Sequence, residues 1–260
     1  MLHHEISGNG KKPLVLLHGF MENTTIWNEM EAHLSKDFTL IKIDLPGHGK
    51  SKVYQEIHTV ELMAEKVKEV IDALKLEKIN LLGHSLGGYV SLAFAEKFPE
   101  ILESMTLFFS TTVADDEEKK AIRKRSIAVI DENFETFVKT SIPNLYKKKK
   151  KDILEGKIEL AKNIAKSTNK EGVKAAQLGM AERPDRTEIL ENLDAKILII
   201  AGKYDNAVKT ENLLKIIPEK TNSKTYVLDC GHNGHWEKPT ICAEIINTEL
   251  FHNLPKHFLL

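Results

Sequence analysis

A serine flanked by glycines is the residue of this chain best placed to do chemistry. Residues 83–88 read G-H-S-L-G-G, so Ser85 stands in a G-x-S-x-G pattern. An apolar segment, 78–82, precedes the pattern, and residues 89–98 have the apolar spacing of a helix. At a tight strand-to-helix turn, small flanking residues let strand and helix approach, and the serine hydroxyl is exposed at the sheet edge. The sequence therefore predicts that Ser85 is a nucleophile; the alternative is an ordinary tight turn.

A serine hydroxyl needs a base to take its proton, and the base needs an acid to orient it. Asp205 follows a strand-like segment and is the predicted acid; the alternative is an aspartate that caps a helix, although Thr210 can itself be that cap. His232, which precedes the last expected helix, is the predicted base. Its rival is His235. Because Gly231 leaves the loop free to bring His232 inward, we expect His235 to line the loop or face solvent.

Acyl-transfer chemistry also needs two backbone N–H groups aimed at the developing oxyanion. Leu86, which follows the serine at the start of a helix, is predicted to supply one of them. Phe20 is predicted to supply the other, because Gly19 lets the backbone turn in closely after the first apolar strand. The alternative for this second segment is a plain strand-end turn. His18 and Trp236 are candidates for lining the substrate pocket.

The other histidines favour structural roles. His84 is expected to point away from Ser85 and to be a hydrogen-bonded core residue, and His48 lies in a turn-rich loop. His3 and His4 are adjacent but have no nearby carboxylate or cysteine partner, so they are weak evidence for a metal. The sequence also has no glycine-rich phosphate loop or dinucleotide fingerprint. We therefore expect no metal and no cofactor.

Short apolar segments alternate with amphipathic segments over most of the chain. Strands are expected at residues 14–17, 39–43, 79–82, 104–108, 197–201 and 225–228. Helices are expected at residues 59–74, 87–98, 210–217 and 240–253. The strand segments are nearly continuous runs of Leu, Ile and Val, which is typical of strands covered on both faces. The alternation predicts an α/β fold with a mostly parallel central sheet flanked by helices.

Residues 111–191 interrupt this alternation. They contain no strand-like run, and their charged helical patterns place helices at 121–130, 134–140, 148–167 and 172–180. We expect a helical insertion here, with the sheet-containing core formed by residues 1–110 and 192–260. The lysine run 147–151 is expected to be a solvated helical face; the alternative is a patch for a membrane or an anionic partner.

Composition excludes several classes of function. A chain of 260 residues with a formal net charge of −1 offers no electrostatic case for nucleic acid or an anionic membrane. Cys230 and Cys242 have neither metal-type spacing nor the number needed for a disulfide framework. No run reaches the ~20 apolar residues that span a bilayer, and the first residues do not resemble a signal peptide. A single-domain cytoplasmic protein is expected, and its oligomeric state is left open.

Five strings, in this order, resemble the α/β-hydrolase superfamily in its compact, esterase-like branch: HGF, DLPGHGKS, GHSLGG, GKYD and GHNGHWEKP. The resemblance covers nearly the whole chain outside residues 111–191. It implies that this insertion is a helical cap over the active site, and that His232 is catalytic with Glu237 five residues further on. A serine at position 85 argues against the related dehalogenases and epoxide hydrolases, which use aspartate. The short amino terminus departs from the family and leaves room for one or two antiparallel strands.

The predicted function is hydrolysis of a small carboxylic ester or thioester by Ser85, His232 and Asp205. One alternative is a lyase or C–C bond enzyme resembling the menaquinone-pathway synthase, which uses the same residue types. In that case a cap arginine would bind a carboxylated substrate; the candidates are Arg123, Arg125 and Arg183. The other alternative is a ligand receptor that keeps the three residues but turns over very slowly.

Overall fold

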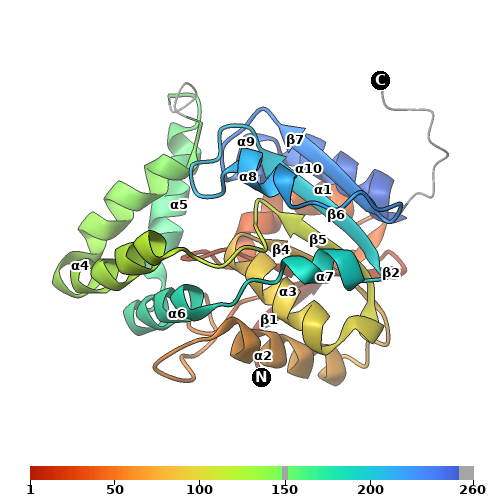
Figure 1. Cartoon of the computed structure of the whole chain (residues 1–260), viewed down its shortest axis with the longest axis horizontal. Helices are drawn as coiled ribbons and strands as arrows, with labels where there is room; N and C mark the ends of the chain where they lie inside the picture. The colour runs from red at the N-terminus through yellow and green to blue at the C-terminus, as the bar shows by residue number, and fades with distance from the viewer. Residues whose placement is uncertain (148–151, 252–260) are drawn as a thin grey trace.

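The computed structural model describes residues 1–147 and 152–251 and builds them around one sheet (Figure 1). The strands lie in the order β1-β3-β2-β4-β5-β6-β7. The pairing of β1 with β3 is antiparallel, and the other neighbours in this sheet are parallel. The strand bounds are β1 His4–Ser7, β2 Lys12–Leu17, β3 Phe38–Ile43, β4 Ile79–His84, β5 Leu102–Phe108, β6 Lys196–Gly202 and β7 Ser223–Leu228.

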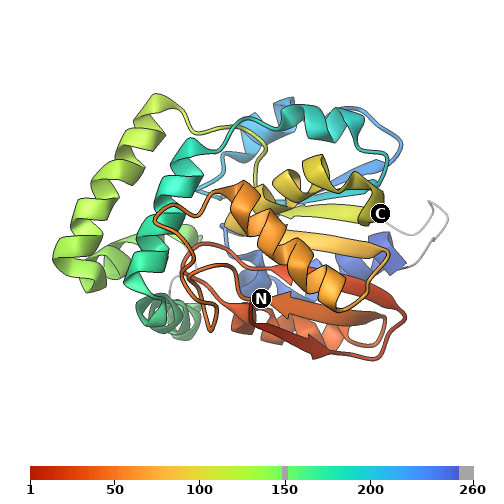
Figure 2. The same cartoon turned by 90° about the horizontal axis from the view of Figure 1, so that it is seen from below.

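Helices cover both faces of this sheet (Figures 1 and 2). Helices α2 (Val60–Ala73) and α3 (Leu86–Lys97) pack against each other on one face, and α1 (Asn28–Leu34) and α10 (Pro239–Ile246) do so on the other. The core also contains shorter elements: α7 Thr187–Asn192, α8 Thr210–Lys215, α9 Gly234–Glu237, 3-10 helices at Thr24–Trp27 and Pro99–Ile101, and a π-helix at Asn247–Phe251.

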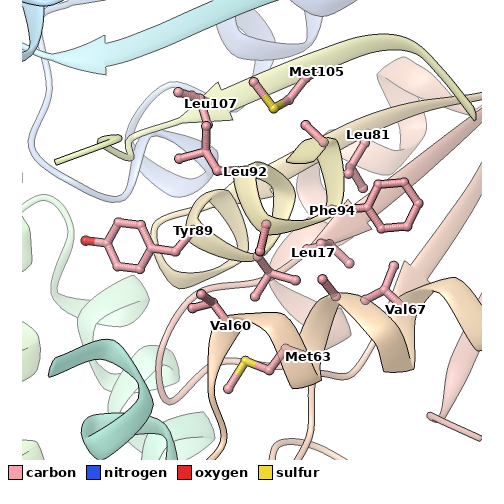
Figure 3. Packing of buried hydrophobic residues seen from close by; sticks show 14 of the residues in the cluster. Leu17, Val60, Met63, Val67, Leu81, Tyr89, Leu92, Phe94, Met105 and Leu107 are labelled. Carbon is pink, nitrogen blue, oxygen red and sulfur yellow. The ribbon is translucent and has the colours of Figure 1, made fainter. Parts of the chain in front are cut away.

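Two hydrophobic clusters, one on each face, hold these layers together. In the first, Leu17, Leu81 and Leu107 come from three adjacent strands and meet Val67 of α2 and Phe94 of α3 (Figure 3). Each of these side chains is fully buried, and burying one of this size stabilises the fold by about 1.5–3 kcal/mol. The apolar strand runs in the sequence are therefore explained by contact with helices on both sides of the sheet.

Helices α4, α5 and α6 stand apart from the sheet layers at one end of the molecule (Figure 2). Their bounds are α4 Glu117–Ser141, α5 Glu155–Ser167 and α6 Lys170–Glu182, with a 3-10 helix at Ile142–Leu145. The backbone of Asn133 is non-helical and divides α4 into two parts, as the separate patterns at 121–130 and 134–140 predict. The Asn133 side chain caps the second part by accepting the Thr136 N–H at 2.9 Å.

The predicted fold class is confirmed: a mostly parallel sheet flanked by helices, with a helical insertion between β5 and β6. The insertion bounds 111 and 191 stay a prediction, and α7 crosses the second of them and packs against α3. In the lysine run, residues 148–151 lie outside the described part of the chain, as does the start of the helix expected at 148–167. Within the described ranges, no helix is both long and apolar enough to cross a bilayer.

Candidate active site

Ser85 lies between the end of β4 and the start of α3, in a strained backbone conformation. Its φ of 50° and ψ of −110° are unusual for a residue other than glycine. The Ser85 N–H donates to the carbonyl of Phe108 at 3.0 Å, which fixes the turn to the neighbouring strand. A Cβ at Gly83 would collide with the backbone of Gly87, and one at Gly88 would collide with Ser110. The glycines around Ser85 are therefore required by close approach of strand and helix.

Ser85, His232 and Asp205 form a continuous hydrogen-bonded chain. The Ser85 Oγ lies 2.8 Å from Nε2 of His232, and Nδ1 of the same ring lies 2.7 Å from Oδ2 of Asp205. His232 and Asp205 are 3% and 6% exposed, so the bond between them is shielded from water. With Nδ1 protonated, Nε2 can accept the serine proton while the carboxylate orients the ring. The structure thus brings the three predicted residues together from three separate loops.

Both oxygens of the Asp205 carboxylate are engaged. Oδ2 faces His232, and Oδ1 accepts the N–H groups of Ala207 and Val208 at 2.8 and 2.9 Å. The aspartate therefore also organises its own loop, but Ala207 and Val208 lie before α8, so the alternative that Asp205 caps this helix is wrong. The expectation that Thr210 caps α8 is wrong, because Lys209 occupies the cap position and the Thr210 hydroxyl donates to the Gly202 carbonyl.

The loop that carries His232 is held from two sides. The His232 N–H donates to the carbonyl of Leu145, in the 3-10 helix of the insertion, at 2.7 Å. The preceding Gly231 N–H donates to Oε1 of Glu237 at 2.8 Å. Glu237, five residues after His232, therefore helps to hold the loop that carries His232. His235 is fully buried, so the expectation that it could face solvent is wrong.

The predicted oxyanion donors follow two adjacent strands. Leu17 of β2 pairs with Gly83 of β4, so the segments after these strands run side by side and carry Phe20 and Leu86 respectively. Leu86 is the first residue of α3, and the N–H of a first-turn residue has no acceptor within its own helix. Phe20 and Ser85 line the same cavity. The arrangement is compatible with two N–H donors beside the serine, and their role stays a prediction.

A cavity of about 400 Å³ lies over Ser85 and His232. The sheet side contributes Phe20, Met21 and Glu22 among others, and the insertion contributes residues of α4, its 3-10 helix and α6. Insertion residues that line it are Lys119, Ile122, Arg123, Ser126, Phe137, Ser141, Leu145, Gln177 and Met180.

The two pocket candidates, His18 and Trp236, are buried and are not among the residues lining this cavity. The Nε2 atom of His18 accepts the Leu45 N–H at 2.9 Å, and burial lowers the pKa of this imidazole. The Trp236 ring stacks on Tyr146, with ring centroids 6.5 Å apart. Both side chains support the loops behind the cavity.

Charged groups of the cap converge on one buried carboxylate. Asp115 accepts hydrogen bonds from Arg183, at 2.8 Å, and from Arg123, and Lys119 lies 3.6 Å away. Burial alone would raise the pKa of Asp115, but the two guanidinium groups lower it to about 2. One carboxylate thus faces three cations, and two of them, Lys119 and Arg123, line the cavity. Arg125, the third predicted arginine, is exposed.

Three buried side chains behind Ser85 carry possible metal-ligand atoms, which lie within 4.8 Å of one another: Glu22, His84 and His235. His84 is a hydrogen-bonded core residue, as predicted, with Nδ1 2.8 Å from Oε2 of Glu22. Glu22 was not anticipated from the sequence. The only signal for it was an acid two residues after Phe20, in a loop expected to reach the site.

The match to known families agrees with this geometry. The model of the alpha/beta hydrolase fold family matches residues 12–239, which is most of the chain. The chain belongs to this family. The matched range contains the serine, the aspartate and the histidine described above, as well as the whole insertion. Membership of this family supports the prediction of a hydrolase at its coarse level.

Individual relatives of this alpha/beta hydrolase differ in how much of the chain they cover. A thermophilic esterase from Thermogutta terrifontis, solved with malate bound, is 33% identical with a TM-score of 0.89, over 96% of this chain and 92% of its own. A Bacillus subtilis protein with the provisional name 2-succinyl-6-hydroxy-2,4-cyclohexadiene-1-carboxylate synthase is 27% identical over 92% of this chain and 90% of its own. An uncharacterized Mycobacterium tuberculosis protein is 35% identical over 111 residues, and this match spans 32% of that protein.

Proposed function

We propose that this alpha/beta hydrolase is a serine hydrolase that cleaves small carboxylic esters or thioesters through an acyl-enzyme on Ser85. The observation that carries the proposal is the unbroken hydrogen-bonded chain from Ser85 through His232 to Asp205. The similarity to the Thermogutta terrifontis esterase supports an ester as the substrate.

The reaction proceeds in two acyl transfers. The Ser85 Oγ forms a bond to the acyl carbon while Nε2 of His232 takes the hydroxyl proton, and Asp205 stabilises the resulting imidazolium. The C–O or C–S bond then breaks, and His232 gives its proton to the departing alkoxide or thiolate. Water then loses a proton to the same nitrogen and attacks the acyl carbon. The bond between that carbon and Oγ breaks, His232 returns the proton to Ser85, and the acid leaves. The N–H groups of Phe20 and Leu86 hold the oxyanion in both steps.

The proposal is tested by replacing Ser85 with alanine and measuring hydrolysis of p-nitrophenyl acetate and butyrate. Loss of the nucleophile is expected to lower kcat by about 10⁴-fold or more. The matched control is Ser91→Ala, six residues along in α3, where the hydroxyl donates only to the Gly87 carbonyl. This control should keep wild-type turnover. Activity of Ser85→Ala close to that of wild type would show the proposal to be wrong.

A second candidate function on the same three residues is a lyase or C–C bond reaction of a carboxylated substrate. The observation that favours it is the pair of cations, Lys119 and Arg123, in the cavity wall. The name of the Bacillus subtilis relative, a carboxylate synthase, points the same way. A panel of esters and acyl-CoA thioesters separates the two candidates. Cleavage of no ester or thioester, together with a melting temperature raised by succinate or malate, would favour the second function. A melting temperature that neither acid changes would rule it out.

A further inference from the structure

A buried ion pair lies directly behind Ser85 and His232. Nδ1 of His84 is 2.8 Å from Oε2 of Glu22, and the two side chains are 1% and 10% exposed. Burying both charges costs desolvation energy, and such pairs are commonly neutral for stability compared with apolar residues. The proposed reaction uses neither side chain to hold or transfer a proton. The contacts of the pair with its surroundings therefore indicate what it does.

The pair connects three segments of the candidate active site. Oε2 of Glu22 also accepts the N–H of Gly19 at 2.6 Å, in the loop that carries Phe20. Nε2 of His84 lies 3.1 Å from the carbonyl oxygen of His232. His84 is the residue before Ser85 in the chain. One carboxylate and one imidazole thus join the loop that carries Phe20, the turn at Ser85 and the loop that carries His232.

The charged forms of both side chains satisfy all of these contacts. The carbonyl of His232 and the Glu22 carboxylate only accept hydrogen bonds, so both ring nitrogens of His84 must carry protons. Gly19 only donates, so Oε2 of Glu22 must remain an acceptor. Beside an ionised Glu22, a neutral His84 has a single N–H and would leave either Glu22 or His232 without its hydrogen bond.

The surroundings keep the pair in these forms. Burial alone would lower the pKa of His84, but the charge of Glu22 raises it above the ordinary value. Burial alone would raise the pKa of Glu22, but His84 holds it well below the usual range. The other ionisable groups that face the pair are His18, Asp205, His232 and His235.

Within this set, His235 is uncharged. Burial lowers its pKa far below the ordinary value, so it does not compete with His84 for the Glu22 charge. Its ring lies against that of His84, with centroids 4.6 Å apart.

We infer that Glu22 and His84 form a positioning clamp, which holds the loops of Phe20 and His232 in register with Ser85. The inference rests on the proposed function, since it assigns the clamp to that reaction. A metal ion at Glu22, His84 and His235 would need a lone pair on a His84 nitrogen, and both nitrogens lie within hydrogen-bond distance of oxygen acceptors, on Glu22 and on the His232 backbone. The hydrogen-bond pattern therefore favours the clamp over a metal site.

Loss of the clamp should act on the transition state more than on substrate binding. In Glu22→Gln the amide oxygen can still accept the Gly19 N–H, but His84 loses the charge that keeps it doubly protonated. A neutral His84 then keeps only one of its two contacts, to residue 22 or to the His232 carbonyl, and the base is less well placed. A small misplacement of a catalytic group costs up to about 100-fold, so kcat should fall about 10- to 100-fold with KM changed less than about threefold.

A double-mutant cycle on ester hydrolysis tests the clamp. Glu22→Gln and His84→Gln should each lower kcat, and the double variant should be no worse than the poorer single one, because either change breaks the same unit. The matched control is Glu61→Gln on helix α2. This change removes the carboxylate that pairs with the buried Arg186 and should keep the wild-type kcat. Independent, multiplicative losses in the double variant, or an unchanged kcat in both single variants, would overturn the inference.

A second readout does not depend on turnover. Nitrogen-15 NMR of the His84 ring at about pH 7.5 should show both nitrogens protonated in the wild-type protein and a neutral ring in Glu22→Gln. A neutral His84 ring in the wild-type protein overturns the clamp even if ester hydrolysis is confirmed. A doubly protonated ring, with shifted amide signals of Gly19 and His232 in the variant, supports it even if no ester is cleaved. Failure of the clamp and failure of the proposed function are therefore distinguishable.

Discussion

The two walls of the cavity are built in different ways. On the sheet wall, Ser85 and His232 follow strands, and the backbone N–H of each is fixed by a hydrogen bond to another segment. On the cap wall, Lys119 and Arg123 belong to α4, a helix of 25 residues in which Ile130 and Val138 are the buried ones. The sheet wall is therefore anchored by packing and hydrogen bonds on all sides, whereas α4 buries few of its own side chains and packs mainly against the other elements of the insertion.

This difference assigns different tasks to the two walls. Groups that transfer protons need fixed geometry, which closely packed strand ends supply. A wall that contacts the rest of the substrate tolerates changes of sequence where its helix buries few side chains, as α4 does. We therefore expect substitutions on the sheet wall to alter the rate of chemistry, and those on the cap wall to alter substrate preference or local stability.

After Ser85→Ala, the largest effect is expected on the same sheet wall, from Asp205→Asn. The amide keeps the hydrogen bonds to Ala207 and Val208 but holds His232 in the wrong tautomer, so Nε2 cannot accept the Ser85 proton. The turnover number should fall by about 10³- to 10⁴-fold, measured with p-nitrophenyl butyrate. The melting temperature checks that the variant is folded. A loss below about tenfold would remove Asp205 from the proposed mechanism and leave the sheet wall without an acid.

The sheet wall is also the wall that the sequence predicts well. Ser85, Asp205 and His232 each follow an apolar strand run, and in a parallel sheet the carboxyl ends of the strands share one edge. Local patterns were therefore sufficient to place these residues near one another. The hydrogen bonds between them agree with that expectation, and their catalytic roles stay predictions.

The structural role of a residue could not be predicted where it depends on a partner far away in the sequence. Glu22 reads as an ordinary loop acid, and its burial depends on His84, 62 residues further along the chain. Asp115 pairs with Arg183, which is 68 residues away. The burial of a charge is decided by the partner that compensates it, and no local pattern shows that partner. The cap residues that line the cavity depend in the same way on how α4 and α6 are placed.

The cap should respond in stability to Asp115→Asn. Its pKa of about 2, against an ordinary value of 3.8, corresponds to about 2 kcal/mol of stabilisation. Because this pKa is lowered on folding, the contribution is complete above the ordinary value and is lost as the pH falls through about 2.

Urea unfolding of wild type and Asp115→Asn at several pH values measures this effect. The variant should lose about 2 kcal/mol at neutral pH, and the difference should shrink as the pH falls below about 4. A difference that stays constant down to pH 2 would mean that the ion pairs with Arg123 and Arg183 do not carry it.

A smaller, substrate-dependent effect is expected from Arg123→Gln. Arg123 lines the cavity, so removal of its guanidinium should raise KM about tenfold for esters that also carry a free carboxylate. The KM for uncharged esters such as p-nitrophenyl butyrate should not change, and this comparison serves as the internal control. An equal rise for both kinds of ester would mean that Arg123 shapes the cavity and does not recognise charge.

The smallest effect is expected at the outer surface of the cap, from Glu117→Gln. Glu117 pairs with Lys120 at 2.8 Å, but its side chain is 90% exposed, whereas the Asp115 side chain is 0% exposed. Water screens the exposed pair and solvates either partner alone, so the melting temperature should change by less than about 2 °C. Calorimetry of Glu117→Gln beside Asp115→Asn makes the comparison within one wall. Equal losses would mean that burial does not separate the two carboxylates, and that the inner face of the cap is no better anchored than its surface.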